Sequence, residues 1–259
     1  MDNFRTAYYR PMNLTRLNTV TVLAVAVLVA AVVYAQNFGS RRGRMMQNEP
    51  PNTELVVARW HFGTNGNIGH RGWSHNYPNS DRNLNEFLKR ATNINVEEMS
   101  FRIIELGSDE VFNYPFTYVS EPGEMELTDQ EVVNLREFIG RGGFVLMDDF
   151  DGAWQLDQLV SQLRRAFPDR QLTPLHIEDR LFHTHFDLNN LQAMSDYVPG
   201  GYITYLGLYD DHDRLAVAAG HNNDLANFWE WYNDPSAPLS PGADAFRLGS
   251  NVVLYSMAH

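Results

Sequence analysis

Most of the chain consists of two kinds of segment: short, uninterrupted apolar runs and longer stretches with apolar residues at helical spacing. The clearest apolar run covers residues 144–147, directly after a pair of glycines. Such a run, bounded by turn residues, predicts a strand that is buried on both faces of a sheet. Residues 128–140 predict a helix before it, because Thr128 and Glu131 fit a capping box and apolar residues follow at helical spacing.

A helix, a glycine turn and a buried strand form half of a βαβ unit, so we expect an α/β fold with a mostly parallel sheet and helices on both faces. The same patterns predict strands over residues 55–58, 101–106, 116–119, 201–208 and 215–219, the last two paired around a turn. They predict helices over residues 81–92, 156–167, 225–231 and 243–258. Ligands bind such sheets beyond the carboxyl ends of the strands, so polar residues that directly follow a strand are the candidates for a site.

The N-terminal region differs from the rest. Three arginines precede an uncharged apolar run over residues 20–33, which ends at small residues near position 35. Residues 1–35 therefore predict a secretory signal peptide or, if uncleaved, an apolar helix over residues 20–35 that anchors the chain in the cytoplasmic membrane. Either reading predicts an exported, extracytoplasmic or periplasmic protein, with a polar linker over residues 36–52 and a folded domain over residues 53–259.

Composition excludes several classes of function. The net charge of −12 makes the protein a poor partner for a phosphate backbone, so we expect no nucleic acid ligand. The chain has no cysteine, which excludes disulfides, thiolate metal sites and cysteine nucleophiles.

A cluster of carboxylates, Asp148, Asp149 and Asp151, follows the clearest strand. Carboxylates this close repel one another, which raises a pKa or favours a divalent cation, and paired acids can also catalyse hydrolysis of a glycoside. The alternative is that one aspartate caps the next helix while the others face water or pair with arginine. An enzyme would need Asp148 or Asp149 near a second titratable group, such as His221 or Glu105.

A long loop over residues 63–79 follows the first predicted strand and contains His70, Trp73, His75 and Tyr77. It carries no phosphate-binding glycine pattern. A loop of this length in a compact domain is usually functional or disordered.

Two further groups are candidates for ligands. His183, His185 and Asp187 alternate, so on a strand they would share one face and suit a metal ion; the alternative is that they are ordinary rim residues. The second group is a polar turn after the last strand with nearby tryptophans, which suits a sugar or another small polar ligand unless it is a helix cap beside core tryptophans. Its residues are His221, Asn222, Asn223, Asp224, Trp229 and Trp60.

Residues 54–259 resemble the bacterial family of domain of unknown function 4159 (DUF4159). The matching segments are Val57-Ala58-Arg59-Trp60, Gly142-Gly143-Phe144-Val145-Leu146-Met147-Asp148-Asp149, Leu181-Phe182-His183, His221-Asn222-Asn223-Asp224 and Ala245-Phe246-Arg247-Leu248-Gly249. The resemblance implies a fold similar to the flavodoxin-like, class I glutamine-amidotransferase-like group, often with a membrane segment. It implies no activity, and glutaminase chemistry cannot be carried over because its cysteine nucleophile is absent.

These observations favour a non-catalytic ligand-binding or assembly module of the cell envelope. Its partners would be the membrane, through an uncleaved N-terminal segment, and an envelope protein or small polar ligand. The alternative is a hydrolase that uses the aspartate cluster, with or without a divalent metal, on a saccharide. We expect no other cofactor.

Overall fold

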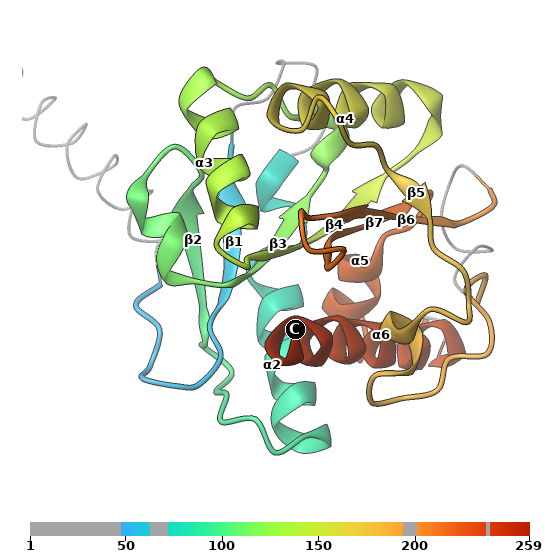
Figure 1. The fold of residues 1–259 in the computed structure, drawn as a ribbon. Helices are drawn as coiled ribbons and strands as arrows, with labels where there is room; N and C mark the ends of the chain where they lie inside the picture. Colours follow the sequence, from blue (N-terminus) through green and yellow to red (C-terminus); the bar gives the residue numbers. More distant parts are fainter. Residues whose placement is uncertain (1–47, 63–71, 194–200, 237–238) are drawn as a thin grey trace, which may run out of the picture. The chain divides into compact units, whose positions relative to one another are not determined.

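The computed structural model describes residues 48–62, 72–193, 201–236 and 239–259, and residues 48–259 form one compact unit. Its centre is a seven-stranded sheet with the order β2-β1-β3-β4-β7-β6-β5 (Figure 1). Neighbouring strands from β2 to β7 are parallel, whereas β6 is antiparallel to both β7 and β5. The predicted α/β fold with a mostly parallel sheet is therefore confirmed.

Except for the short β5, which the sequence did not predict, the strands agree with the expected positions to within a few residues. They are β1 (Val57–His61), β2 (Phe101–Glu105), β3 (Phe116–Ser120), β4 (Phe144–Phe150), β5 (Thr173–Pro174), β6 (Thr204–Tyr209) and β7 (Leu215–His221). Strand β4 is longer than the apolar run that predicted it, because Asp148 and Asp149 continue the strand instead of following it. The last two long strands pair around a turn, as predicted.

Within the described residues, five α-helices cover the two faces of the sheet. Helices α3 (Asp129–Gly140) and α4 (Gly152–Ala166) lie on one face, and α2 (Asn79–Ala91), α5 (Leu225–Glu230) and α6 (Leu239–Ala258) on the other (Figure 1). The capping box predicted for α3 is present, since the Thr128 hydroxyl accepts from the backbone N–H of Glu131 while the Glu131 carboxylate accepts from that of Thr128. Each of the five predicted helices is confirmed, with ends that differ by a few residues.

Alternation along β4 places its side chains in two separate cores. Phe144 and Leu146 pack with the layer of α2, α5 and α6, whereas Val145 and Met147 pack with the layer of α3 and α4. Asp148 continues this alternation and is fully buried in the strand. Because carboxylates are rarely fully buried, Asp148 indicates that the end of β4 does more than pack the core.

The turn between α3 and β4 depends on a small residue. A Cβ atom at Gly143 would overlap with the ring of Phe138, whereas one at Gly140 meets nothing within 4 Å. We expect Gly143→Ala to lower the free energy of unfolding by about 1–3 kcal/mol, because a rigid ring must move. Gly140→Ala, in the last turn of α3, should leave it unchanged or raise it by up to about 1 kcal/mol. Urea denaturation of both variants checks this pair, and equal losses would contradict it.

None of the helices within the described residues is both long and apolar enough to cross a membrane. The predicted signal peptide or anchor over residues 1–35, and most of the linker over residues 36–52, lie outside the described residues. The last linker residues do contact the domain, because the side chain of Asn48 donates hydrogen bonds to the backbone oxygens of Met99 and Phe101.

Candidate functional site

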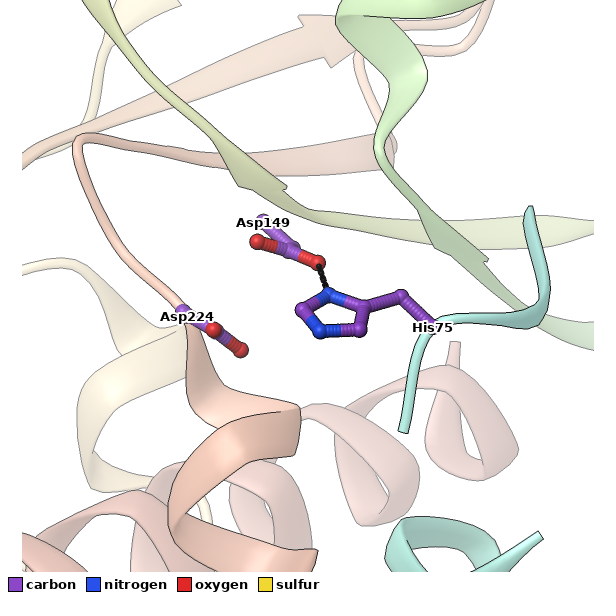
Figure 2. A group of neighbouring side chains, drawn as sticks. All are labelled: His75, Asp149 and Asp224. Carbon is purple, nitrogen blue, oxygen red and sulfur yellow. Dashed lines mark hydrogen bonds and ion pairs between the residues drawn. The ribbon is translucent and has the colours of Figure 1, made fainter. Parts of the chain in front are cut away.

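Polar side chains from four separate segments meet at the carboxyl edge of the sheet. Asp149 lies at the end of β4, and its Oδ2 is 2.6 Å from Nδ1 of His75, which belongs to the segment between β1 and α2 (Figure 2). The hydroxyl of Ser120, at the end of β3, donates to the same Oδ2 at 3.2 Å. Residues up to 74 positions apart in the sequence thus form one polar cluster around Asp149.

Asp224, which follows β7, completes the cluster from the opposite side. Its carboxylate points toward the imidazole of His75 (Figure 2), and one ligand atom each from His75, Asp149 and Asp224 lie within 4.8 Å of one another. The Oδ1 of Asp224 also accepts from the backbone N–H of Asn227, so this aspartate caps helix α5. The cap fixes the direction of the carboxylate.

The backbone at this edge is strained. Asn76, Glu121, Asp149 and Asn222 have φ angles of 60°, 50°, 66° and 56°, a region that residues other than glycine rarely occupy. Asp149 also lies where the pairing of β4 with β7 shifts register. Strained residues persist where the surrounding structure holds them in place, and they gather at functional sites.

The buried carboxylate of Asp148 is used for structure. Its Oδ2 accepts from the backbone N–H groups of Leu225 and Ala226, at the start of α5, and from the hydroxyl of Tyr118. Burial, and next the negative charge of Asp149, raise the pKa of Asp148 to about 7. Asp148 therefore anchors α5 to the sheet and keeps a proton at mildly acidic pH.

Glu121 adds a fourth carboxylate directly after β3. Its Oε1 is 3.4 Å from Nδ1 of His75. Burial, and then the charges of Asp149 and Glu124, raise the pKa of Glu121 to about 8. Burial and the charges of Asp149 and Asp148 likewise raise the pKa of Asp224 well above its usual value. The hydrogen bond to Asp149 raises the pKa of His75.

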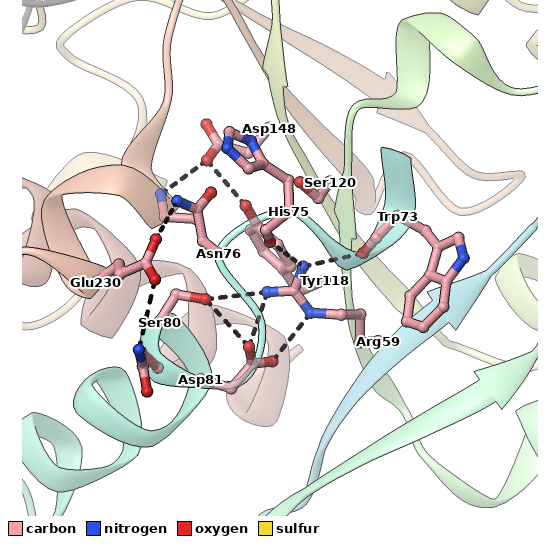
Figure 3. A network of polar contacts seen from close by, with 12 residues as sticks. Arg59, Trp73, His75, Asn76, Ser80, Asp81, Tyr118, Ser120, Asp148 and Glu230 are labelled. Carbon is pink, nitrogen blue, oxygen red and sulfur yellow. Dashed lines mark hydrogen bonds and ion pairs between the residues drawn. The ribbon is translucent and has the colours of Figure 1, made fainter. Parts of the chain in front are cut away.

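Arg59 of β1 holds the segment that carries His75 in place. This fully buried guanidinium donates to the backbone oxygens of Trp73 and His75 and pairs with both carboxylate oxygens of Asp81 (Figure 3). It also lies over the ring of Tyr118, 4.6 Å from the centroid. Arg59 makes no contact with the carboxylates of the site but determines where His75 lies.

The partners expected for the aspartates, His221 and Glu105, lie elsewhere. His221 instead contacts the backbone oxygen of Gly152 through Nε2, and Glu105 pairs with His61. Asp151 occupies the cap position of α4, yet its side chain forms no capping hydrogen bond. The titratable partner of Asp149 is therefore His75, from the long loop that the sequence analysis flagged without selecting a residue.

The predicted polar turn after β7 lies beside this cluster. Asn222 connects two loops, because its Oδ1 accepts from the backbone of Gly152 and its Nδ2 donates to the backbone of Tyr202. Asn223 donates through Nδ2 to the hydroxyl of Tyr205 and lies 3.5 Å from Oδ1 of Asp148. Their side-chain contacts hold the edge of the sheet together.

Trp60 and Trp229 do not suit the expected stacking role. Both are buried, at 0% and 1% exposure, because Trp60 points from β1 into the core under α3 and Trp229 packs against α6. Neither ring presents a face to solvent. The alternative, core tryptophans beside a helix cap, fits the structure.

The strand expected for His183, His185 and Asp187 is wrong. Residues Arg180–His183 form a 3-10 helix, so these side chains do not alternate across a sheet. His183 contacts Asp187 and the backbone oxygen of Ile177, whereas Nε2 of His185 contacts the backbone oxygen of Ala91. A metal site there stays a prediction, without the strand geometry on which it was based.

These features define an α/β protein with an acidic, histidine-containing cluster at the carboxyl edge of a mostly parallel sheet. The chain belongs to the family described as domain of unknown function (DUF4159), whose model matches residues 61–257. The match confirms the family suggested by the sequence motifs. Comparison with curated proteins gives no match.

Proposed function

We propose that this domain is an extracytoplasmic hydrolase that acts on a saccharide, the alternative among the two functions considered from the sequence. The observation that carries the proposal is the 2.6 Å contact between Asp149 and His75, with Oε1 of Glu121 at 3.4 Å from the same ring nitrogen. The cluster supplies the aspartate and second titratable group that acid/base catalysis requires. The extracytoplasmic location rests on residues 1–35, outside the described part of the chain.

The strand order supports a site at this position. Counted along the chain, the five parallel strands have the order 2-1-3-4-5, which is the flavodoxin-like order, and the order reverses between β1 and β3. His75 follows β1 and Glu121 follows β3. Ligands of flavodoxin-like proteins bind at this switch point. The order also supports the flavodoxin-like, amidotransferase-like fold that the family resemblance implies.

In the proposed reaction the Asp149–His75 pair accepts a proton from water as the oxygen attacks the anomeric carbon. The glycosidic bond breaks as Glu121 donates its proton to the departing oxygen, and the proton taken from water then restores that of Glu121, so one water is consumed per bond. A carboxyl group with a pKa of about 8 can hold a proton at neutral pH and donate it, which is the property of a general acid.

A saccharide suits the surroundings of the cluster. A cavity of about 420 Å³ is lined in part by Tyr205, whose hydroxyl accepts from Asn223, although none of its lining residues belongs to the cluster. Its walls include Asn189, Asn190 and Tyr202, and ligand cavities commonly measure about 300–1,000 Å³. Tyr202 is 75% exposed and Trp154, at the start of α4, is 56% exposed, so both rings could stack on sugar.

The test is hydrolysis of a panel of p-nitrophenyl glycosides by the purified full-length chain, with Mn²⁺, Zn²⁺ or Ca²⁺ added. We expect His75→Gln and Glu121→Gln to lower kcat/KM about 100-fold or more, because each removes a proton-transfer group. Asp151→Asn, at the same edge but outside the cluster, is the matched control and should retain the activity. The proposal would be refuted if turnover were unchanged in both His75→Gln and Glu121→Gln, or if no glycoside were hydrolysed.

The non-catalytic envelope module remains the second candidate, because Asp148 and Asp224 both hold the start of α5 and Asn222 joins two loops. A binding protein needs only such fixed loops and exposed rings. It would retain purified polysaccharide without cleaving it, and Trp154→Ala with Tyr202→Ala would abolish the retention. A small polar ligand and an envelope protein partner belong to this candidate, and no nucleic acid is proposed for either.

A further inference from the structure

The cluster of His75, Asp149 and Asp224 has the dimensions of a metal site. Two ligands of one ion, with bonds of about 2.0–2.4 Å, lie at most about 4–5 Å apart. The ligand atoms of these three side chains lie within 4.8 Å of one another, and the residues come from three different segments. An ion between them would need only small side-chain adjustments.

A second observation comes from Asn76, the neighbour of His75. Its Nδ2 donates to Oε2 of Glu230 at 2.8 Å, and this contact fixes which end of the amide faces that carboxylate. The other end, Oδ1, is buried and has no hydrogen-bond partner among the described residues, although Asn76 is only 6% exposed. Figure 3 shows Oδ1 directed away from Glu230, toward the side of Asp148 and His75.

A buried carbonyl oxygen without a donor destabilises the fold, and a cation bound to it removes that cost. Rotating the amide would not help, because it would place oxygen against the Glu230 carboxylate. Amide and carboxylate oxygens are the ligands of hard divalent cations. Asn76 thus points to a cation independently of the acidic residues.

The charges of the cluster agree with this assignment. Glu121, Asp148, Asp149 and Asp224 crowd one edge, and among the described residues no lysine or arginine pairs with any of them. The buried Arg59 is already paired with Asp81. A divalent ion would supply the missing positive charge among these carboxylates.

We infer that His75, Asp149 and Asp224, with Oδ1 of Asn76, bind one divalent cation of the Mn²⁺ type. One imidazole with oxygen ligands suits Mn²⁺, since imidazole is a ligand of transition metals while carboxylates and carbonyls suit the harder ions. The site deepens the proposed hydrolase, on which its functional role rests, because a bound cation lowers the pKa of a coordinated water and so prepares the attacking group.

The test uses the full-length chain, freed of metals with a chelator, and titrates MnCl₂ while free Mn²⁺ is followed by electron paramagnetic resonance. We expect one tight site per chain and a higher melting temperature in its presence. Asp149→Asn and Asp224→Asn should each weaken binding about tenfold or more, by loss of a charged ligand. Both variants preserve the backbone, because asparagine tolerates positive φ and caps helices as well as aspartate does.

Asp151→Asn is the matched control: it removes an equal charge at the same edge and should bind Mn²⁺ like the wild type. Equal weakening in all three variants would show a diffuse effect of negative charge and overturn the site, as would no binding at 1 mM MnCl₂. Tight binding of Zn²⁺ or Ca²⁺ instead, with the same dependence on Asp149 and Asp224, would support the site and correct the ion. Because binding is measured without substrate, a chain that binds Mn²⁺ but cleaves no glycoside refutes only the hydrolase.

Discussion

Replacing Arg59 by alanine is expected to lower the free energy of unfolding by about 3–5 kcal/mol, because the change leaves the buried Asp81 carboxylate without its partner. Both side chains are almost completely buried, at 1% and 2% exposure, and the pair is held by two hydrogen bonds. The backbone oxygens of Trp73 and His75 lose their donor in the same step. Urea denaturation of the wild type and the variant measures the difference.

Arg141→Ala is the control for this prediction. Arg141 pairs with Glu137 on the surface of α3, where both side chains are about half exposed, so its loss should change the free energy of unfolding by less than about 1 kcal/mol. If the two variants lost similar stability, the buried pair would not hold the His75 segment. Arg59→Lys, which retains a charge but cannot form the same set of hydrogen bonds, should fall between them.

The importance of Arg59 shows why the site was harder to predict than the fold. Helix α3 and strand β4 follow from local signals, namely a capping box, an apolar run and a glycine turn. Arg59 follows four apolar residues in the sequence and looks like the polar end of a strand. Its burial depends on Asp81, 22 residues away, and no local pattern relates the two.

The contact between Asp149 and His75 was equally hard to predict, because the two residues lie 74 positions apart in the sequence. The sequence placed Asp148 and Asp149 correctly at a carboxyl edge, because parallel strands end together. It could not show that Asp148 faces inward and Asp149 lies near the ring of His75, since that depends on a register shift within β4. Nor could it select His75 from a long loop, because the residues that fix its place, Arg59 and Asp149, belong to other strands.

The opposite failure occurred at His183, His185 and Asp187. Alternation in the sequence predicts a shared face only if the segment is extended. Here the segment forms a short 3-10 helix, and two residues of that helix, Leu181 and Phe182, are buried. A period of two over five residues is too short to distinguish a strand from a turn whose apolar residues happen to be adjacent.

Replacing Asp148 by alanine is expected to lower the free energy of unfolding by about 2–4 kcal/mol at pH 5. Three donors, the N–H groups of Leu225 and Ala226 and the hydroxyl of Tyr118, would lose their acceptor in the interior. The start of α5 would also lose its link to β4. Asp148→Asn should lose less stability, because its amide retains an acceptor oxygen for these donors. If the amide of the neighbouring Asn223 turns to accommodate the new group, the hydroxyl of Tyr205 can rotate with it.

The same residue gives stability a dependence on pH whose sign follows from its pKa. Asp148 has a pKa of about 7 in the folded protein, against about 3.9 in an unfolded chain. Between these values the folded state binds more protons than the unfolded state, so the free energy of unfolding falls as the pH rises from about 4 to about 7. Glu121 extends the decline toward pH 8, because burial and the charges of Asp149 and Glu124 raise its pKa to about 8.

Asp148→Asn cannot ionise, so it should make this decline shallower without abolishing it, and its stability relative to the wild type should improve as the pH rises. Urea denaturation at half-unit steps from pH 4 to pH 8, with a chelator present, measures both slopes. Parallel curves for the two proteins would show that Asp148 titrates normally and is not the buried acid that the structure describes. A steeper decline in the variant would contradict the assignment of Asp148 as a proton-holding anchor of α5, because only the loss of a group with a raised pKa reduces the slope.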